Sequence, residues 1–198
     1  MKLTLSGAAL LLIIACNPTP QKTADKKSAP AVEMLTTEQT VFIRQWSETY
    51  NPKNIPVLAI FRNRYFHKTD LNQLHEYLKR NKKDVDFSMV EKELRIKTEL
   101  YTDTDAVNTI TWINNTDVET CDKVDRDFWG CFNRRYTTNE FYYLSMPLFS
   151  SDNQWCMLHV ALQRKEKGQS FGGGRLYHLV KGKWKEVAFL SNWGKQPE

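Results

Sequence analysis

Apolar residues recur at helical spacing in the first part of the predicted domain. Over residues 37–50, Phe42 and Trp46 fall on one face of a helix. Thr36 and Gln39 have the spacing of a capping box, in which each side chain hydrogen-bonds the backbone of the other residue. The pattern therefore predicts a helix over residues 37–50.

A second helix is predicted after a short apolar run. The run at residues 55–61 fits a strand or a buried turn, and the Asn-Pro-Lys-Asn sequence before it ends the first helix. Leu71, Leu74 and Leu78 share one face of the second helix, which is expected to begin at residue 69 or 70 and to end near residue 81.

From residue 85 onward the apolar period changes from helical to alternating. The pattern predicts strands at residues 94–101, 107–113, 141–148, 155–163, 175–181 and 183–190, with polar or glycine-rich turns between them. Lys181-Gly182-Lys183 is typical of a tight hairpin between the last two. Helices followed by consecutive strands predict an α+β fold, with the N-terminal helices on one face of an antiparallel meander.

The N-terminus has the pattern of a secretory signal. Lys2 precedes a short apolar run that ends at Ala15, directly before Cys16. A cysteine after a small residue at this place resembles the lipobox of bacterial lipoproteins. The resemblance implies that residues 1–15 are removed and that Cys16 becomes the acylated first residue. Two or more acyl chains hold a protein on a membrane more firmly than one chain does.

The stretch after Cys16 is predicted to be a disordered tether. Residues 17–34 are rich in Pro, Lys, Ser, Thr and Ala and contain few large apolar side chains. Fully extended, about 18 residues reach roughly 60 Å, so the domain predicted at residues 35–198 stays near the membrane. The segment lacks the acidic cluster that resembles a surface-export signal, which favours a periplasm-facing anchor in the cell envelope.

The charge balance argues against nucleic acid as a partner. Without residues 1–15 the chain has 27 basic and 23 acidic residues, a formal charge of +4. The signs alternate along most of the sequence, whereas nucleic-acid binders concentrate basic residues on one surface.

Three cysteines remain besides Cys16. Cys121 and Cys131 are close in sequence and are the expected disulfide in an oxidising envelope. Cys156 lies in an apolar strand pattern and is expected to be a buried thiol.

The C-terminal quarter resembles a known group of envelope proteins. Residues 144–150 and 181–187, with the glycine-rich turn between them, look like the C-terminal meander of uncharacterised lipoproteins from the Bacteroidetes cell envelope. The resemblance implies a location and a sheet, and it brings no catalytic residue.

A candidate histidine pair depends on the register of one hairpin. If the turn is centred near Gly168 and Gln169, His159 lies directly opposite His178 and the two rings could bind a transition metal. A bulge or a one-residue slip would separate the rings. Since no third ligand has suitable spacing, a metal site is not predicted.

Aromatic and arginine side chains gather around the expected disulfide. Such a composition is typical of partner-binding surfaces. The candidate contact residues of this predicted loop are Phe128, Trp129, Phe132, Arg134, Arg135 and Tyr136. The hypothesis requires Trp129 or Phe132 to be exposed.

No short catalytic motif is present, and no cofactor is predicted. Gly-x-Ser-x-Gly, His-Glu-x-x-His and Cys-x-x-Cys are all absent from the sequence. The glycines at 172–174 lack the Lys-Ser ending of a phosphate loop and predict a flexible hairpin tip. Asp122, Asp125 and Asp127 predict a solvated acidic loop rather than a calcium site.

These observations favour a membrane-anchored envelope lipoprotein that binds a protein or another envelope component. Two alternatives remain open. A cell-wall or polysaccharide hydrolase would need a deep cleft with two opposed carboxylates, whereas an envelope binder that uses the loop at residues 121–136 and a periplasmic immunity protein would both need an exposed aromatic patch.

Overall fold

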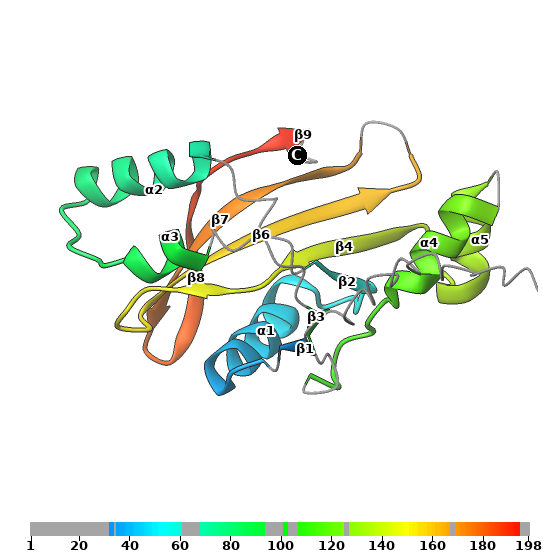
Figure 1. Ribbon diagram of the computed structural model, residues 1–198, viewed down its shortest axis with the longest axis horizontal. Helices are drawn as coiled ribbons and strands as arrows, with labels where there is room; N and C mark the ends of the chain where they lie inside the picture. Colours follow the sequence, from blue (N-terminus) through cyan, green and yellow to red (C-terminus); the bar gives the residue numbers. More distant parts are fainter. Residues whose placement is uncertain are drawn as a thin grey trace, which may run out of the picture.

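The computed structural model describes residues 32–33, 35–60, 68–93, 101–102, 107–124, 127–166 and 169–194 (Figure 1). The helices are α1 (Thr37–Tyr50), α2 (Lys68–Arg80), α3 (Ser88–Glu93), α4 (Asn115–Val124) and α5 (Phe128–Tyr136). The strands are β1 (Val32–Glu33), β2 (Val57–Ile60), β3 (Tyr101–Thr102), β4 (Glu140–Ser145), β5 (Leu148–Phe149), β6 (Trp155–Arg164), β7 (Phe171–Val180), β8 (Lys183–Phe189) and β9 (Trp193–Gly194). The signal peptide, Cys16 and the predicted strand at residues 94–101 lie outside these ranges, except for Tyr101.

The α+β class is confirmed, and the sheet is mixed. Its main path is β2-β4-β6-β7-β8, with β5 beside β6 and β9 beside β7. The pairs β4–β6, β6–β7 and β7–β8 are antiparallel, as in a meander, whereas β2 pairs parallel to β4. A separate parallel pair joins β1 to β3, so Val32 and Glu33 belong to a strand rather than to the predicted tether.

Helices cover both faces of the sheet, so the expectation of a single covered face is wrong. Cys156, Leu158 and Val160 of β6 pack in one cluster with α1, whereas Trp155 and Met157 pack with α2 and α3. Side chains of a strand alternate between the two faces. The first eight residues of β6 are all buried because each face has its own helical cover.

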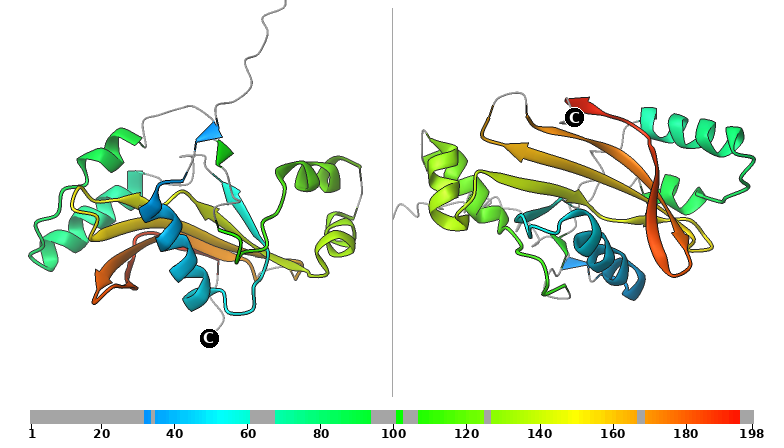
Figure 2. Two further views of the ribbon diagram at one scale, coloured as in Figure 1. Left: turned by 90° about the horizontal axis from the view of Figure 1, so that it is seen from below. Right: turned by 180° about the vertical axis from the view of Figure 1, so that it is seen from behind.

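The second face is covered at two places by different helices. Phe132 of α5 packs with Phe141 of β4. Phe141 pairs with Gln163 of β6, and Gln163 points to the same face of the sheet as Trp155 and Met157. Phe141 therefore lies on the second face. Figures 1 and 2 show α2 and α3 near one end of the long strands, α4 and α5 near the other end, and α1 between them. Among the described residues, α1 is the helix that packs on its side of the sheet, together with the segment that contains Val107, Ile110 and Trp112.

The first helix has the predicted bounds and the predicted cap. The hydroxyl of Thr36 accepts a hydrogen bond from the backbone of Gln39, and the side chain of Gln39 accepts one from the backbone of Thr36. Phe42, Ile43 and Trp46 form the buried face. The capping box thus sets where the helix begins, and the apolar stripe sets which face of the helix packs against the sheet.

Polar side chains of α1 cover the open edge of β8. The side chain of Gln45 accepts a hydrogen bond from the backbone of Trp184 and donates one to the carbonyl of Gly182. The hydroxyl of Tyr50 accepts one from the backbone of Glu186. Unpaired edge groups are a hazard for aggregation, and here α1 satisfies them. The same bonds set the position of α1 against the sheet.

Two sequence-predicted elements take other forms. The stretch at residues 107–113 contains turns and one bridge, in which Trp112 pairs with Val57, instead of a strand. The glycines at 172–174 lie inside β7 rather than at a hairpin tip. A Cβ at Gly173 would meet the carbonyl of Ser191, and one at Gly174 would meet the carboxylate of Asp70. Glycine is therefore required here because other chain segments approach β7 closely on both sides.

Candidate functional site

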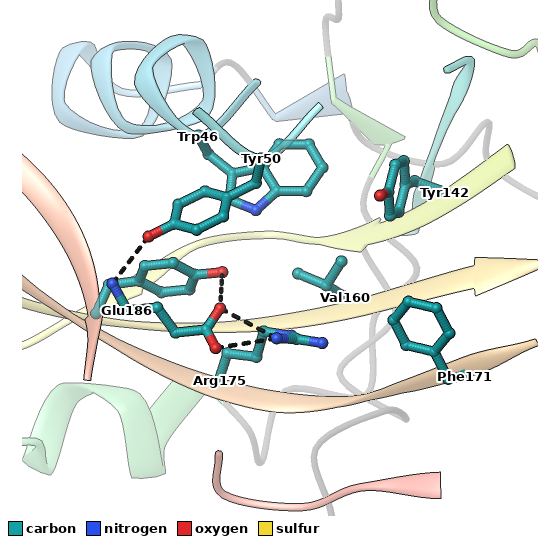
Figure 3. Close-up of a pocket in the computed structure, with 8 residues that line it drawn as sticks. Trp46, Tyr50, Tyr142, Val160, Phe171, Arg175 and Glu186 are labelled. Atoms are coloured by element: carbon teal, nitrogen blue, oxygen red, sulfur yellow. Dashed lines mark hydrogen bonds and ion pairs between the residues drawn. The ribbon is translucent and has the colours of Figure 1, made fainter. Parts of the chain in front are cut away.

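A hollow of about 230 Å³ opens on the α1 side of the sheet, where α1 leaves the strands uncovered. We refer to it as the α1 hollow (Figure 3). Its lining comes from α1 (Trp46, Tyr50), β4 (Tyr142), β6 (Val160), β7 (Phe171, Arg175, Tyr177) and β8 (Glu186). Five of these eight residues are aromatic, and two form an ion pair.

The floor of the α1 hollow contains a largely buried ion pair. Nη1 of Arg175 lies 3.0 Å from each carboxylate oxygen of Glu186. The two side chains are 11% and 18% exposed, so water screens them much less than a surface pair. Their charges cancel, which makes the floor polar but neutral.

Glu186 is also held by two tyrosines. Its backbone nitrogen donates to the Tyr50 hydroxyl over 3.0 Å, and one carboxylate oxygen accepts a long hydrogen bond of 3.4 Å from Tyr177. The rings of Tyr50 and Tyr177 meet edge to face with centroids 5.7 Å apart. Because α1, β7 and β8 all contribute, the carboxylate has a defined place in the hollow.

Burial raises the pKa of two tyrosine hydroxyls that line the hollow. Burial raises the pKa of Tyr177 well above its usual range, and the nearby charge of Glu186 acts in the same direction. Burial also raises the pKa of Tyr142, with Glu140 as a second cause. At neutral pH both groups therefore remain hydrogen-bond donors as well as acceptors.

The guanidinium of Arg175 has donors that Glu186 does not use. Its Nε is buried and has no hydrogen-bond partner within the described part of the chain. The guanidinium carbon lies 4.5 Å from the ring centre of Phe189, a half-exposed residue at the end of β8. Figure 3 shows the guanidinium directed toward the space between Val160 and Phe171. Arg175 therefore offers hydrogen-bond donors to a ligand between aromatic walls.

No pattern in the sequence predicted the α1 hollow. Its residues come from segments more than 130 positions apart, such as Tyr50 and Glu186. The sequence contained one weak indication of the site. Arg175 and Glu186 are charged, although most residues on the same face of their strands are apolar. Such a pattern indicates a charged group on a covered face only after the strand register is known.

The predicted aromatic contact loop is a pair of helices. Residues 115–124 and 128–136 form α4 and α5, and the predicted disulfide between Cys121 and Cys131 joins them. Phe132 is fully buried against Phe141, and its ring stacks on that of Phe128. Trp129 is only partly buried and packs on the same cluster. The aromatics of this α4–α5 hairpin therefore form a small core, because a hydrophobic face on α5 requires a cover.

The polar candidates of the α4–α5 hairpin hold it together or lie at its surface. The carboxylate of Asp117 on α4 binds Arg135 and accepts a hydrogen bond of 2.7 Å from the Tyr136 hydroxyl. Burial and this hydrogen bond raise the pKa of Tyr136. Arg134 is exposed. The structure thus divides the six candidate residues between internal packing and an exposed rim.

The predicted opposition of His159 and His178 is wrong. His159 pairs with Gly174, and His178 pairs with Trp155, so the two histidines share a face but lie four residues apart along it. Four residues of a strand span about 13 Å, too far for one metal ion. The ring of His178 instead stacks on Trp155 at 4.0 Å between centroids. Within the described ranges, no group of three or more His, Cys, Asp or Glu side chains could hold a metal ion.

The third predicted cysteine behaves as expected. Cys156 is a free thiol with no exposed surface, in the core on the α1 side. Burial raises its pKa well above the usual thiol range, so it stays protonated at neutral pH. A protonated, inaccessible thiol is a poor nucleophile, and Cys156 is a packing residue.

Comparison with known protein families, characterised proteins and solved structures finds no match to this chain. In the described part of the chain, no helix is both long and apolar enough to span a bilayer. Functional inference therefore depends on the α1 hollow and on the N-terminal sequence.

Proposed function

We propose that this chain is a lipid-anchored lipoprotein of the bacterial cell envelope whose folded part is a non-catalytic binding module. The lipobox-like sequence before Cys16 supports the anchor. The proposed binding site is the α1 hollow, and the proposed partner is a component of the envelope rather than nucleic acid.

The observation that carries the binding proposal is the buried ion pair beneath aromatic walls. A buried charge pair adds little stability compared with apolar residues of the same size. Ligand sites typically combine aromatic walls with a few convergent polar groups, and the α1 hollow has this composition. The arrangement of Arg175 and Glu186 is therefore better explained by recognition than by folding.

The same geometry favours binding over hydrolysis. A glycosidase uses two separate carboxyl groups, one of which must donate a proton. Glu186 supplies the one carboxylate among the described residues that line the α1 hollow, and Arg175 engages both of its oxygens. Among the described lining residues, the second carboxyl group that a glycosidase needs is missing. Because Phe132 is buried, we propose the α1 hollow rather than the α4–α5 hairpin as the binding site.

The anchor is tested by replacing the acylated residue. In cells that make the full chain, Cys16→Ser is expected to abolish the incorporation of radiolabelled palmitate into the protein, because the thiol that carries the lipid is lost. Cys156→Ser is the matched control and is expected to keep the label. A labelled Cys16→Ser chain would contradict the anchor.

The binding module is tested with the unlipidated Cys16→Ser chain and washed envelope material. The chain is expected to co-sediment with the envelope, and Phe171→Ala is expected to reduce the retained amount about tenfold. Trp193→Ala removes an exposed aromatic side chain on β9 that is not part of the hollow, and it is expected to have no effect. Equal retention of all three chains, or no retention at all, would refute binding through the α1 hollow.

A further inference from the structure

We infer that the α1 hollow binds one neutral sugar ring of an envelope saccharide. This inference deepens the proposed binding function and depends on it. It specifies the ligand class from the size, the charge and the hydrogen-bonding groups of the hollow.

The size of the hollow fits a single ring. Its volume of about 230 Å³ is smaller than the roughly 300–1,000 Å³ of sites that enclose drug-sized molecules. The hollow opens to solvent, since Tyr50, Tyr142 and Phe171 of its lining are partly exposed, so a chain of which one unit enters the hollow can continue outside it. A terminal or internal unit of a longer saccharide satisfies this geometry.

The charge of the hollow favours a neutral ligand. Arg175 and Glu186 cancel each other at 3.0 Å. The next charges along β4 and β6, Glu140 and Arg164, also form a pair, with 2.8 Å between Nε and the carboxylate. An anionic ligand would be attracted by Arg175 but repelled by Glu186. A cationic ligand would be attracted by Glu186 but repelled by Arg175.

The polar groups of the hollow match hydroxyls. Arg175 can only donate hydrogen bonds and the carboxylate of Glu186 can only accept them, whereas the tyrosine hydroxyls can do both. A sugar hydroxyl also donates and accepts, so neighbouring hydroxyls can meet both members of the ion pair. An apolar side chain of a protein partner would instead cover the remaining donors of Arg175. These donors would lose their hydrogen bonds to water and gain none in return, which costs free energy.

The walls of the hollow suit the carbon-bound faces of a sugar. Tyr50, Tyr142 and Phe171 are partly exposed, and they line the hollow from three different elements. Figure 3 shows Tyr142 and Phe171 on the side of the hollow opposite the ion pair. A ring between them can pack its C–H surface on the aromatic side chains while its hydroxyls face Arg175 and Glu186.

The test uses saturation-transfer NMR with the full Cys16→Ser chain and three defined probes: maltotriose, cellotriose and N,N′,N″-triacetylchitotriose. We expect saturation transfer from the protein to the ring protons of at least one trisaccharide. The same trisaccharide, added in solution, is expected to reduce the amount of protein that co-sediments with the envelope. Phe171→Ala is expected to weaken the affinity about tenfold, and Trp193→Ala is expected to leave it unchanged. Tyr142→Phe, which keeps the ring and removes one hydroxyl, is expected to give an intermediate loss.

Two outcomes would overturn the inference, and they differ from failure of the proposed function. If the chain co-sediments with envelope material in a Phe171-dependent way but no saccharide gives saturation transfer or competes, the sugar is wrong and the binding module stands. If Phe-Ala-Phe tripeptide saturates and competes while the sugars do not, the ligand is a peptide. Circular dichroism of each variant ensures that the comparison uses folded chains.

Discussion

Arg175→Met is expected to destabilise the fold by about 3–5 kcal/mol, because it leaves the Glu186 carboxylate buried without its partner. The charge of Glu186 cannot turn outward easily, since Tyr50 holds its backbone and Tyr177 contacts its carboxylate. Urea unfolding followed by tryptophan fluorescence measures the change in the free energy of unfolding.

The double variant Arg175→Met with Glu186→Gln distinguishes the loss of charge pairing from the loss of packing. It removes both charges and keeps side chains of similar size, so most of the stability is expected to return, to within about 1–2 kcal/mol of the parent. If Arg175→Met were as stable as the parent, water would have free access to the Glu186 carboxylate. Loss of sugar binding in the stable double variant would assign the pair to recognition.

Phe132→Ala is expected to destabilise the protein by about 3–5 kcal/mol, because the residue is fully buried among aromatic rings. The ring centroids of Phe132 and Phe141 are 5.0 Å apart, and the ring of Phe132 also stacks on those of Phe128 and Tyr136. Its removal leaves a cavity between α5 and the sheet. Urea unfolding again measures the effect.

The matched control for Phe132 lies two residues further along α5. Arg134 is exposed, and Arg134→Ala is expected to lower the free energy of unfolding by no more than about 1 kcal/mol, the most that a surface side-chain interaction usually contributes. If Phe132→Ala were equally mild and instead reduced envelope binding, the original hypothesis of an aromatic contact surface would be correct and the packing role would be wrong.

The predicted helices show which features local sequence determines. The apolar stripe and the capping box of α1 gave its bounds, and Leu71, Leu74 and Leu78 gave the second helix to within a few residues. Helical periodicity and capping depend on residues within one or two turns of each other, so they can be recognised without knowledge of the partner. The hydrophobic alternation likewise located β6, β7 and β8.

The disulfide segment shows the limit of composition. Cys121 and Cys131 were paired correctly from their separation, but the residues around them were predicted to be a loop. Phe128, Phe132 and Tyr136 have the i, i+4, i+8 spacing of a helix face, a signal that the density of aromatic residues obscured. Whether such a face is a contact surface or a core depends on what covers it.

By itself the sequence determined the class of the fold, the positions of α1, α2, β4, β6, β7 and β8, the disulfide and the buried thiol, because short-range periodicity and spacing encode them, whereas α3, α4 and α5 were not predicted. The tertiary structure alone decided that helices cover both faces, that His159 and His178 lie apart, and that Arg175 and Glu186 meet beneath aromatic walls. Those features depend on strand register and on contacts between distant segments. A shift of the register by a few residues changes every cross-strand neighbour while leaving the hydrophobic pattern almost the same.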